Sequence, residues 1–234
     1  MNKTICFVRG SLPDRQENQA RLLHATGAYL QQESASIGGL HVNIVSAPPA
    51  NLPYRPPSDP NAGKEPEYDA IIEVWSEEAP PLAAARLRAG IRPAIRSFHA
   101  YAVTATRIYD RQTFPRGKPS EGIKLIGRLM FHADMPDSAV KRSWGLHAGL
   151  AARVHTGSAI YIQNWVEAAL GEDCPPTRGM PIMHFPTDED FFERFVDTPR
   201  GMDEIIQDTS HFVAGGPRFY TTEHILRGSP SGLP

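Results

Sequence analysis

The sequence predicts an α+β fold in which two ferredoxin-like βαββαβ units, joined in one chain, combine their sheets into a single barrel. Three observations lead to this prediction. Strand-like segments recur at a nearly constant offset, both halves show strand and helix patterns in the same order, and the strands are apolar on both faces. A βαββαβ unit carries both helices on one face of its sheet, so two units can cover each other's open faces as two protomers would.

The repeat pairs three strand-like segments of the first half with three of the second. The offset is roughly 119 residues when Arg9 is aligned with Arg128. The pairs are Thr4–Val8 with Ile123–Phe131, His41–Val45 with Ile160–Asn164, and Tyr101–Ile108 with Phe219–Leu226. We therefore expect a first unit over residues 1–110, a linker over 111–121, a second unit over 122–228 and a flexible tail over 229–234.

Periodicity and breaker residues place the elements of the first unit in order. Strands are expected at Thr4–Arg9, His41–Ser46, Tyr68–Val74 and Tyr101–Tyr109, and helices at Asp14–Gln32 and Leu82–Ala89. The segment Ala47–Pro66 contains seven prolines, which remove backbone donors and exclude helix and central strand. It is therefore a loop, and loops of this length often carry a function, such as that of a lid.

The second unit repeats the order after a polar linker with two prolines, Arg111–Glu121. Strands are expected at Ile123–His132, Ile160–Trp165, Ile182–Phe185 and Phe219–Leu226. A long helix is expected at Ser138–His155, and shorter helical segments at Asp188–Val196 and Met202–Phe212, with Pro199-Arg200-Gly201 separating them.

Composition narrows the class of protein and of partner. The 234 residues are 41% hydrophobic, which is enough for a buried core. With 24 basic and 26 acidic residues the net charge is -2, so the chain has no electrostatic signature for nucleic acid or an anionic membrane. It has no apolar run of spanning length, and Met1–Gly10 is too short for a signal peptide. The two cysteines lack metal or redox spacing, so we expect a cytoplasmic protein.

Trp144 and His147 lie close together in the expected helix SAVKRSWGLHAGLAARVH. Here the chain resembles the EthD family of the dimeric α+β barrel superfamily, whose members commonly carry a tryptophan followed a few residues later by a histidine on the first helix. Residues 188–213 resemble the family's acidic and aromatic stretch before the last strand, and Tyr68–Trp75 resembles its third strand. The first half has His24 but no partnering tryptophan, so it can serve as scaffold.

The resemblance implies a pocket in a barrel and enzymes of aromatic and polyketide metabolism that work without a cofactor. Isomerases, decarboxylases, dehydratases, cyclases and oxygenases all occur in the superfamily, so the fold does not choose among these reactions.

Helical periodicity selects one face of the helix at Ser138–His155. At about 100° per residue, Trp144, His147 and His155 fall on one side, which we expect to meet the sheet. His147 can transfer a proton near neutral pH, because an unperturbed imidazole has a pKa of about 6.5. The alternative is a buried structural histidine that donates to a backbone carbonyl. His155 is expected to be a favourable charge at the helix C-terminus.

Alternation along the expected strands adds further candidates. Arg128 and His132 share a face at Ile123–His132, and Arg128 aligns with Arg9, so two arginines can approach one cavity and bind an anionic group. Alternatively, each arginine reaches solvent at a strand end. The remaining candidates are aromatic or histidine side chains that suit an aromatic ligand, or that simply belong to the core: Tyr161, Trp165, His184, Tyr220 and His224.

These residues predict an enzyme of aromatic-compound metabolism that needs no cofactor, most plausibly a lyase or isomerase. The expected catalytic residues are His147, His132 and His224, and the expected substrate-binding residues are Arg128, Trp144, Tyr161, Trp165, His184, Tyr220 and Arg9. The expected substrate is a small aromatic or polyketide-like compound, and a homodimer is possible. The sequence contains no metal-binding or nucleotide-binding motif, although histidines of separate strands can still converge on a metal.

Two alternatives stay open at this stage. One is a carrier that binds an apolar aromatic ligand without catalysis, and the other is an oxygenase that works without a cofactor or with haem.

Overall fold

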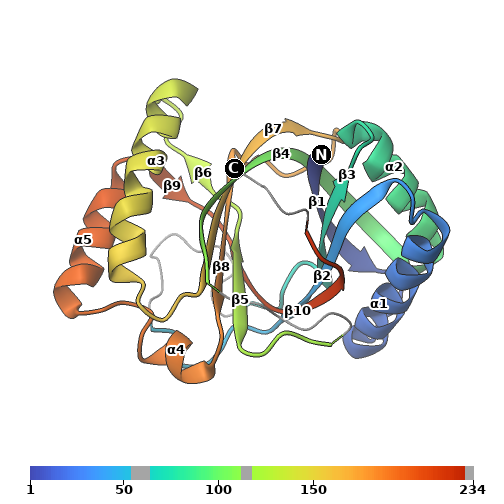
Figure 1. Ribbon diagram of the computed structural model, residues 1–234, viewed down its shortest axis with the longest axis horizontal. Coiled ribbons are helices and arrows are strands. Elements are labelled where there is room, and N and C mark those ends of the chain that lie inside the picture. Colours follow the sequence, from blue (N-terminus) through green and yellow to red (C-terminus); the bar gives the residue numbers. More distant parts are fainter. Residues whose placement is uncertain (54–63, 112–117, 230–234) are drawn as a thin grey trace.

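The computed structural model describes residues 1–53, 64–111 and 118–229, and it shows one closed barrel flanked by helices (Figure 1). The first unit contains β1 (Asn2–Gly10), α1 (Arg15–Gln32), β2 (Ile37–Ser46), β3 (Ala70–Ser76), α2 (Pro80–Ile91) and β4 (Ile95–Asp110). The second unit contains β5 (Ile123–Gly127), β6 (Met130–Phe131), α3 (Asp137–Val154), β7 (Ile160–Ala169), β8 (Gly179–Phe185), α4 (Asp188–Phe192), α5 (Pro199–Ser210), β9 (Val213–Gly215) and β10 (Arg218–Arg227).

The strand order confirms the predicted fold class. Within the first unit the strands lie in the order β4-β1-β3-β2, and within the second in the equivalent order β10-β5-β8-β7. The pairs β2–β10 and β4–β7 join the two sheets and close the barrel, and every pair is antiparallel. Closure leaves neither sheet with an open edge.

The helices cover the outside of the barrel on two opposite sides. Figure 1 shows α1 and α2 packed on the first unit and α3, α4 and α5 on the second, with the barrel between them. Because side chains alternate along each strand, one set of residues fills the barrel and the other packs under the helices. A site in this fold can therefore form inside the barrel or between a sheet and its helices.

The first strand of the second unit is shorter than predicted. We expected one strand over Ile123–His132, but β5 ends at Gly127 and β6 pairs with β9 in a separate two-stranded sheet. At this break the chain passes close to Gly216, where a Cβ would lie 1.9 Å from the carbonyl oxygen of Arg128. Gly216 also has a φ of +141°, which other residues rarely adopt. The interruption ends the alternation on which the expected face of Arg128 and His132 depended.

Two further details differ from the sequence prediction. Pro199-Arg200-Gly201 forms the first turn of α5 rather than a separator, because Thr198 caps the helix and proline is favourable at its first position. The helix α4 ends at Phe192, four residues before the expected end.

The second strands of the two units, β2 and β7, correspond at an offset of 121 residues rather than 119. The amide of Asn43 donates to the carbonyl oxygen of Ile71 at 2.9 Å, and the amide of Asn164 donates to that of Met180 at 2.8 Å. Asn43 faces Ile71 and Asn164 faces Met180 in the β2–β3 and β7–β8 pairs, so the two asparagines are equivalent. Phe7 faces Ile71 in the β1–β3 pair, and the β5–β8 register, with Ile126 opposite Ile182, extends to Arg128 opposite Met180. Arg128 therefore corresponds to Phe7, and the expected pairing of Arg128 with Arg9 is wrong.

Parts of three predicted segments fall outside the described residues. These are residues 54–63 of the proline-rich loop, 112–117 of the linker and 230–234 of the tail. Among the helices of the described residues, none is long and apolar enough to cross a membrane.

Candidate active site

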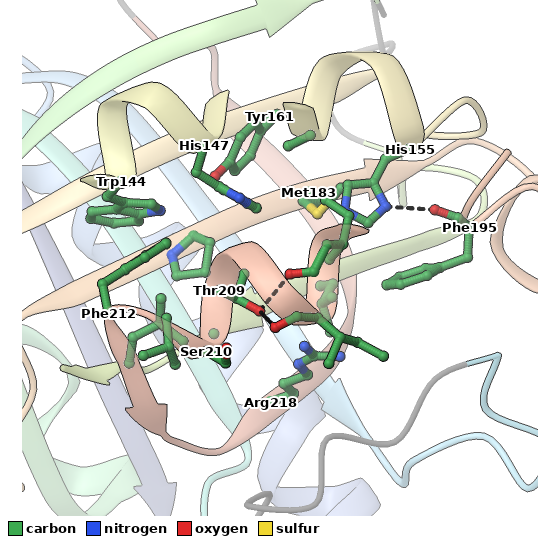
Figure 2. A pocket seen from close by; sticks show the side chains of 18 residues that line it. Trp144, His147, His155, Tyr161, Met183, Phe195, Thr209, Ser210, Phe212 and Arg218 are labelled. Carbon is green, nitrogen blue, oxygen red and sulfur yellow. Dashed lines mark hydrogen bonds between the residues drawn. The ribbon is translucent and has the colours of Figure 1, made fainter. Parts of the chain in front are cut away.

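A cavity of about 280 Å³ lies between the sheet of the second unit and the helices α3 and α5. Its lining side chains come from both helices, from β5, β7, β8 and β10, and from the segment that follows α5 (Figure 2). The cavity is outside the barrel, whereas the sequence led us to expect a pocket inside it. The reason is that α5 packs on α3 and leaves space above the outward-facing side chains of the sheet.

The face of α3 that lines the cavity is the one that helical periodicity predicted. Trp144, His147 and His155 all point at the sheet and line the cavity (Figure 2). Leu146 lies on the opposite side of the helix and is 74% exposed. Three predicted site residues, Trp144, His147 and Tyr161, are thus brought together at one cavity.

His147 forms a dyad with Asp208 of α5. Nδ1 of His147 lies 2.6 Å from a carboxylate oxygen of Asp208, so in the neutral ring Nδ1 carries the proton and donates it to the carboxylate. Burial lowers the pKa of His147, and the hydrogen bond and charge of Asp208 offset part of this effect. Among the described residues Nε2 has no hydrogen-bond partner. This nitrogen is therefore a neutral base that can meet a molecule in the cavity.

His155 is buried and uncharged, so the expectation of a charged group at the helix end is wrong. Its Nδ1 donates to the carbonyl oxygen of Phe195 at 2.5 Å (Figure 2). Burial lowers the pKa of His155 to about 4, although the hydrogen bond to Phe195 acts in the opposite direction. At neutral pH the second ring nitrogen is an acceptor at the wall of the cavity.

The pKa of His155 predicts a loss of stability in mild acid. The unfolded chain takes up the proton near pH 6.5 and the folded chain only near pH 4, so folding is disfavoured as the pH falls between these values. We expect the free energy of unfolding to fall by roughly 3 kcal/mol from this residue alone over that range. Urea unfolding at several pH values, on the wild type and on His155→Gln, measures it. An equally steep loss in the variant would contradict the prediction.

Tyr161 of β7 is held beside His147 by Gln163 of the same strand. The two rings lie 6.5 Å apart between centroids and at 90°. The side-chain nitrogen of Gln163 lies 3.0 Å from the hydroxyl oxygen of Tyr161 and 2.8 Å from the carbonyl oxygen of Trp144. Burial raises the pKa of Tyr161 well above its ordinary value, so the phenol stays protonated.

The rest of the lining is mostly apolar, with polar groups at one side. Arg218 of β10 reaches the cavity from the sheet, and Thr209 and Ser210 reach it from the end of α5 (Figure 2). The Thr209 hydroxyl donates to the carbonyl oxygen of Ile205 at 2.7 Å, which leaves its oxygen as an acceptor. The apolar lining residues are Leu125, Leu129, Ala151, Pro181, Met183, Phe195, Ile205, Ile206, Phe212 and Val213.

Four of the other predicted site residues lie on the outer side of the sheet or beside the cavity without lining it. His132 follows β6 and donates through Nε2 to the carbonyl oxygen of Ser210 at 2.9 Å. Trp165 stacks on Phe131 at 5.9 Å between centroids, in a cluster below α3. Tyr220 packs in the core under α3 and α5, and His224 is half-buried four residues further along β10.

The remaining three lie at the barrel. Arg128 donates to the hydroxyl oxygen of Tyr68 at 3.1 Å and lies over the ring of Phe7. His184 is inside the barrel, where Nε2 donates to the carbonyl oxygen of Glu121 at 2.8 Å. Arg9 is exposed near the end of β1. The predicted anion site at Arg128 and the predicted catalytic histidine His147 thus belong to different places in the fold.

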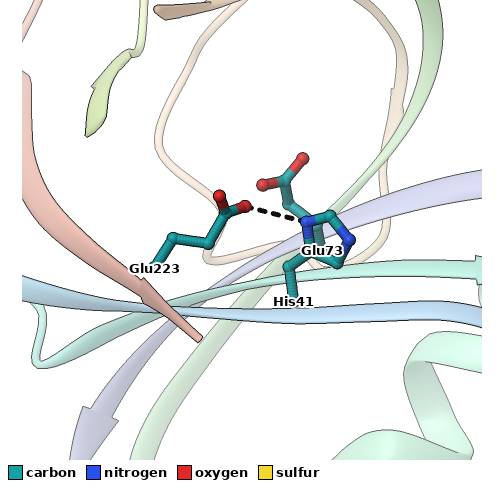
Figure 3. Close-up of side chains that lie close together, drawn as sticks. All are labelled: His41, Glu73 and Glu223. Atoms are coloured by element: carbon teal, nitrogen blue, oxygen red, sulfur yellow. Dashed lines mark hydrogen bonds and ion pairs between the residues drawn. The ribbon is translucent and has the colours of Figure 1, made fainter. Parts of the chain in front are cut away.

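The inside of the barrel holds a buried network of charges that both units share. Figure 3 shows His41, Glu73 and Glu223 close together, the one group of described residues with the spacing of metal ligands. Lys124 donates to both carboxylates, and Lys3 pairs with Glu73 at 2.8 Å. Two ammonium groups therefore already neutralise two carboxylates, and the geometry favours an ion-pair network over a metal site.

Glu73, Glu223 and Lys124 hold one another in the ionised state. Burial alone would raise the pKa of Glu73, but attraction by Lys124 and Lys3 outweighs burial and holds it far below its ordinary value. Glu223 shows the same balance, with Lys124 as the strongest attraction. Burial would lower the pKa of Lys124, yet the two carboxylates raise it. Each of the two lysines and each of the two glutamates has an oppositely charged partner, which supports a structural role for the network.

The sequence analysis missed Asp208, Gln163 and Arg218. Asp208 lies 61 residues after its partner His147 and comes from another helix, so no local spacing marks the pair. Gln163 could have been found from alternation, because it shares a strand face with Tyr161 and Trp165.

Comparison with known proteins agrees with this fold. No family model matches the chain, and neither does any curated protein, so the resemblance to the EthD family stays a prediction. Among solved structures, a candidate monooxygenase from Fusobacterium nucleatum subsp. nucleatum is similar at 10% identity and a TM-score of 0.59, covering 100% of this chain and 95% of that one. An anthrone oxidase-like protein is similar at 8% identity and a TM-score of 0.61, covering 99% and 96%.

A mutant chlorite dismutase from Candidatus Nitrospira defluvii is similar at 9% identity and a TM-score of 0.53, covering 94% of this chain and 90% of that one. At these identities the similarities show the fold alone. The closed arrangement of two βαββαβ units and these neighbours together establish that this chain has the dimeric α+β barrel fold, completed within one polypeptide.

Proposed function

We propose that this protein is an enzyme that moves a proton on an aromatic substrate, with His147 as the general base. The single observation that carries the proposal is the dyad of His147 and Asp208, 2.6 Å apart, in which His147 lines an apolar cavity. The carboxylate fixes the tautomer of the imidazole and stabilises the imidazolium that forms when the base takes a proton. A histidine that served only packing would not need a carboxylate partner and an unpaired nitrogen toward a cavity.

The shape and chemistry of the cavity favour a small, flat, apolar substrate. Its volume of about 280 Å³ is near the lower end of ligand sites, which span roughly 300–1,000 Å³. Trp144 and Phe212 offer aromatic faces, while Arg218 and the hydroxyl groups of α5 offer polar contacts (Figure 2). An aromatic compound with one or two oxygen substituents matches this combination.

The proposed step conserves atoms and electrons without a cofactor. Nε2 of His147 takes a proton from an acidic C–H bond, and the electron pair moves into a conjugated carbonyl group to give an enolate or phenolate. Return of the proton at another position completes an isomerisation, and loss of a leaving group completes a lyase reaction. Both outcomes agree with the reaction classes expected from the sequence.

An oxygenase is the second candidate function, and the names of two fold neighbours favour it. One is a candidate monooxygenase and another is anthrone oxidase-like. The same base can begin such a reaction, because a carbanion formed by His147 can reduce dioxygen. Converting a CH₂ group to a carbonyl group then consumes one O₂ and releases one water.

Haem does not fit the cavity that His147 lines. A porphyrin with its two propionates needs more space than about 280 Å³, and among the described residues that line this cavity Arg218 is the one arginine or lysine. We therefore derive no step through haem.

Anthrone is a suitable first probe, because it is flat, apolar and carries an acidic CH₂ group opposite its carbonyl group. We would measure exchange of its CH₂ protons in D₂O by NMR, under argon and in air, with an oxygen electrode in parallel. Enzyme-dependent exchange under argon supports the acid–base enzyme, and oxygen uptake in air supports the oxygenase. Binding with neither activity would favour a carrier, and absence of binding would contradict the proposed substrate class.

A further inference from the structure

We propose that Gln163 is a positioning residue that turns the hydroxyl proton of Tyr161 into the cavity, where it stabilises an oxyanion of the substrate opposite the base His147. This inference rests on the proposed function and deepens it, because it names the substrate class. The class is an aromatic carbonyl compound whose deprotonation places negative charge on oxygen.

The orientation of the Gln163 amide follows from Trp144. A backbone carbonyl oxygen accepts hydrogen bonds and cannot donate, so the Gln163 atom 2.8 Å from it must be the NH₂ group. The same NH₂ group lies 3.0 Å from the hydroxyl oxygen of Tyr161. In this contact Gln163 is therefore the donor and Tyr161 is the acceptor.

The hydroxyl proton of Tyr161 must then point elsewhere. No acceptor for the Tyr161 proton is found among the described residues. Because Tyr161 lines the cavity, a bound molecule can supply the missing acceptor.

The position of this donor suits proton abstraction next to a carbonyl group. The rings of His147 and Tyr161 stand at 90° with centroids 6.5 Å apart, so one small molecule can touch both. A base at one atom and a fixed donor at the developing oxyanion is the arrangement that stabilises an enolate. Burial keeps the phenol protonated even in alkaline solution, because it raises the pKa of Tyr161.

Binding of 2-naphtholate at pH 10 tests the donor without any turnover, with naphthalene as the neutral control. We expect Tyr161→Phe and Gln163→Met to weaken naphtholate binding about tenfold or more, since hydrogen bonds to charged groups are the stronger class. Naphthalene affinity should change less than twofold. Equal naphtholate affinity in wild type and Tyr161→Phe would overturn the inference and leave the role of His147 intact.

A double-mutant cycle separates positioning from a general structural role. In the Tyr161→Phe background, Gln163→Met should cost no further naphtholate affinity, because its effect acts through the hydroxyl group. An equal loss in both backgrounds would overturn the positioning role. Failure of the wild type to bind either naphthalene or naphtholate would overturn the aromatic site itself, and with it the inference.

Discussion

Replacing His147 by alanine is expected to lower kcat about 10²–10⁴-fold on any substrate whose proton the enzyme removes, because general-base catalysis contributes about this much. The substitution removes Nε2 while the rest of the cavity remains. Exchange of the anthrone CH₂ protons, followed by NMR, is the measurement. Leu146→Ala is the matched control, since Leu146 is the neighbouring helix residue and is 74% exposed.

The pH dependence makes this prediction sharper. The base works when neutral, so the rate should rise with pH through the pKa of His147, which burial places below its ordinary value. Asp208 raises this pKa, so Asp208→Asn should move the acidic limb of the pH–rate profile to lower pH. The same substitution should also lower kcat, because asparagine does not hold the imidazole tautomer as a carboxylate does.

Two results would contradict the role of His147. Full turnover by His147→Ala would exclude it as the base. A shift of the acidic limb to higher pH in Asp208→Asn would show that the carboxylate does not stabilise the protonated imidazole.

Replacing Lys124 by methionine is expected to lower the free energy of unfolding by about 3–5 kcal/mol, the usual cost of leaving a buried charge without its partner. Lys124 donates to Glu73 of the first unit and Glu223 of the second, and all three side chains are at most 5% exposed. Methionine preserves the length of the side chain but leaves both carboxylates under-compensated inside the barrel. Urea unfolding at pH 7 measures the change.

Two control variants accompany this prediction. Lys118→Met replaces an exposed lysine and should change the free energy of unfolding by less than about 0.5 kcal/mol. In Lys124→Met with Glu223→Gln, part of the lost stability should return, because one uncompensated charge is removed. A double variant as unstable as the sum of the two single variants would show that the residues do not act as a network.

The parts of the fold that the sequence predicted are those that local patterns encode. The face of α3 that carries Trp144 and His147 follows from the 3.6-residue period alone. The break after Gly127 was not predictable, because it depends on the close approach of Gly216, far along the chain. The contact of Asp208 with His147 was not predictable for the same reason, because only the packing of α5 on α3 brings the two residues together.

The location of the site illustrates a second limit. Alternation placed Tyr161 and Trp165 on one face of their strand but could not say whether that face meets the barrel or the helices. For Arg128 the alternation was extended beyond Gly127, where β5 ends, so the predicted face does not apply to this residue. A pattern of period two assigns residues to two sets, and only the tertiary structure decides which set lines a cavity.

The two units share an architecture, but they use the space under their helices differently. In the first unit Tyr29 packs so tightly against α2 that a Cβ at Gly90 would lie 2.5 Å from its ring, whereas in the second unit α5 leaves a cavity. Two identical protomers would have to carry every change twice. Fusion removes that symmetry constraint, so one copy can become a permanent partner that closes the barrel while the other specialises for a ligand. The difference between the two units is then encoded in the amino-acid sequence and does not arise when a ligand binds.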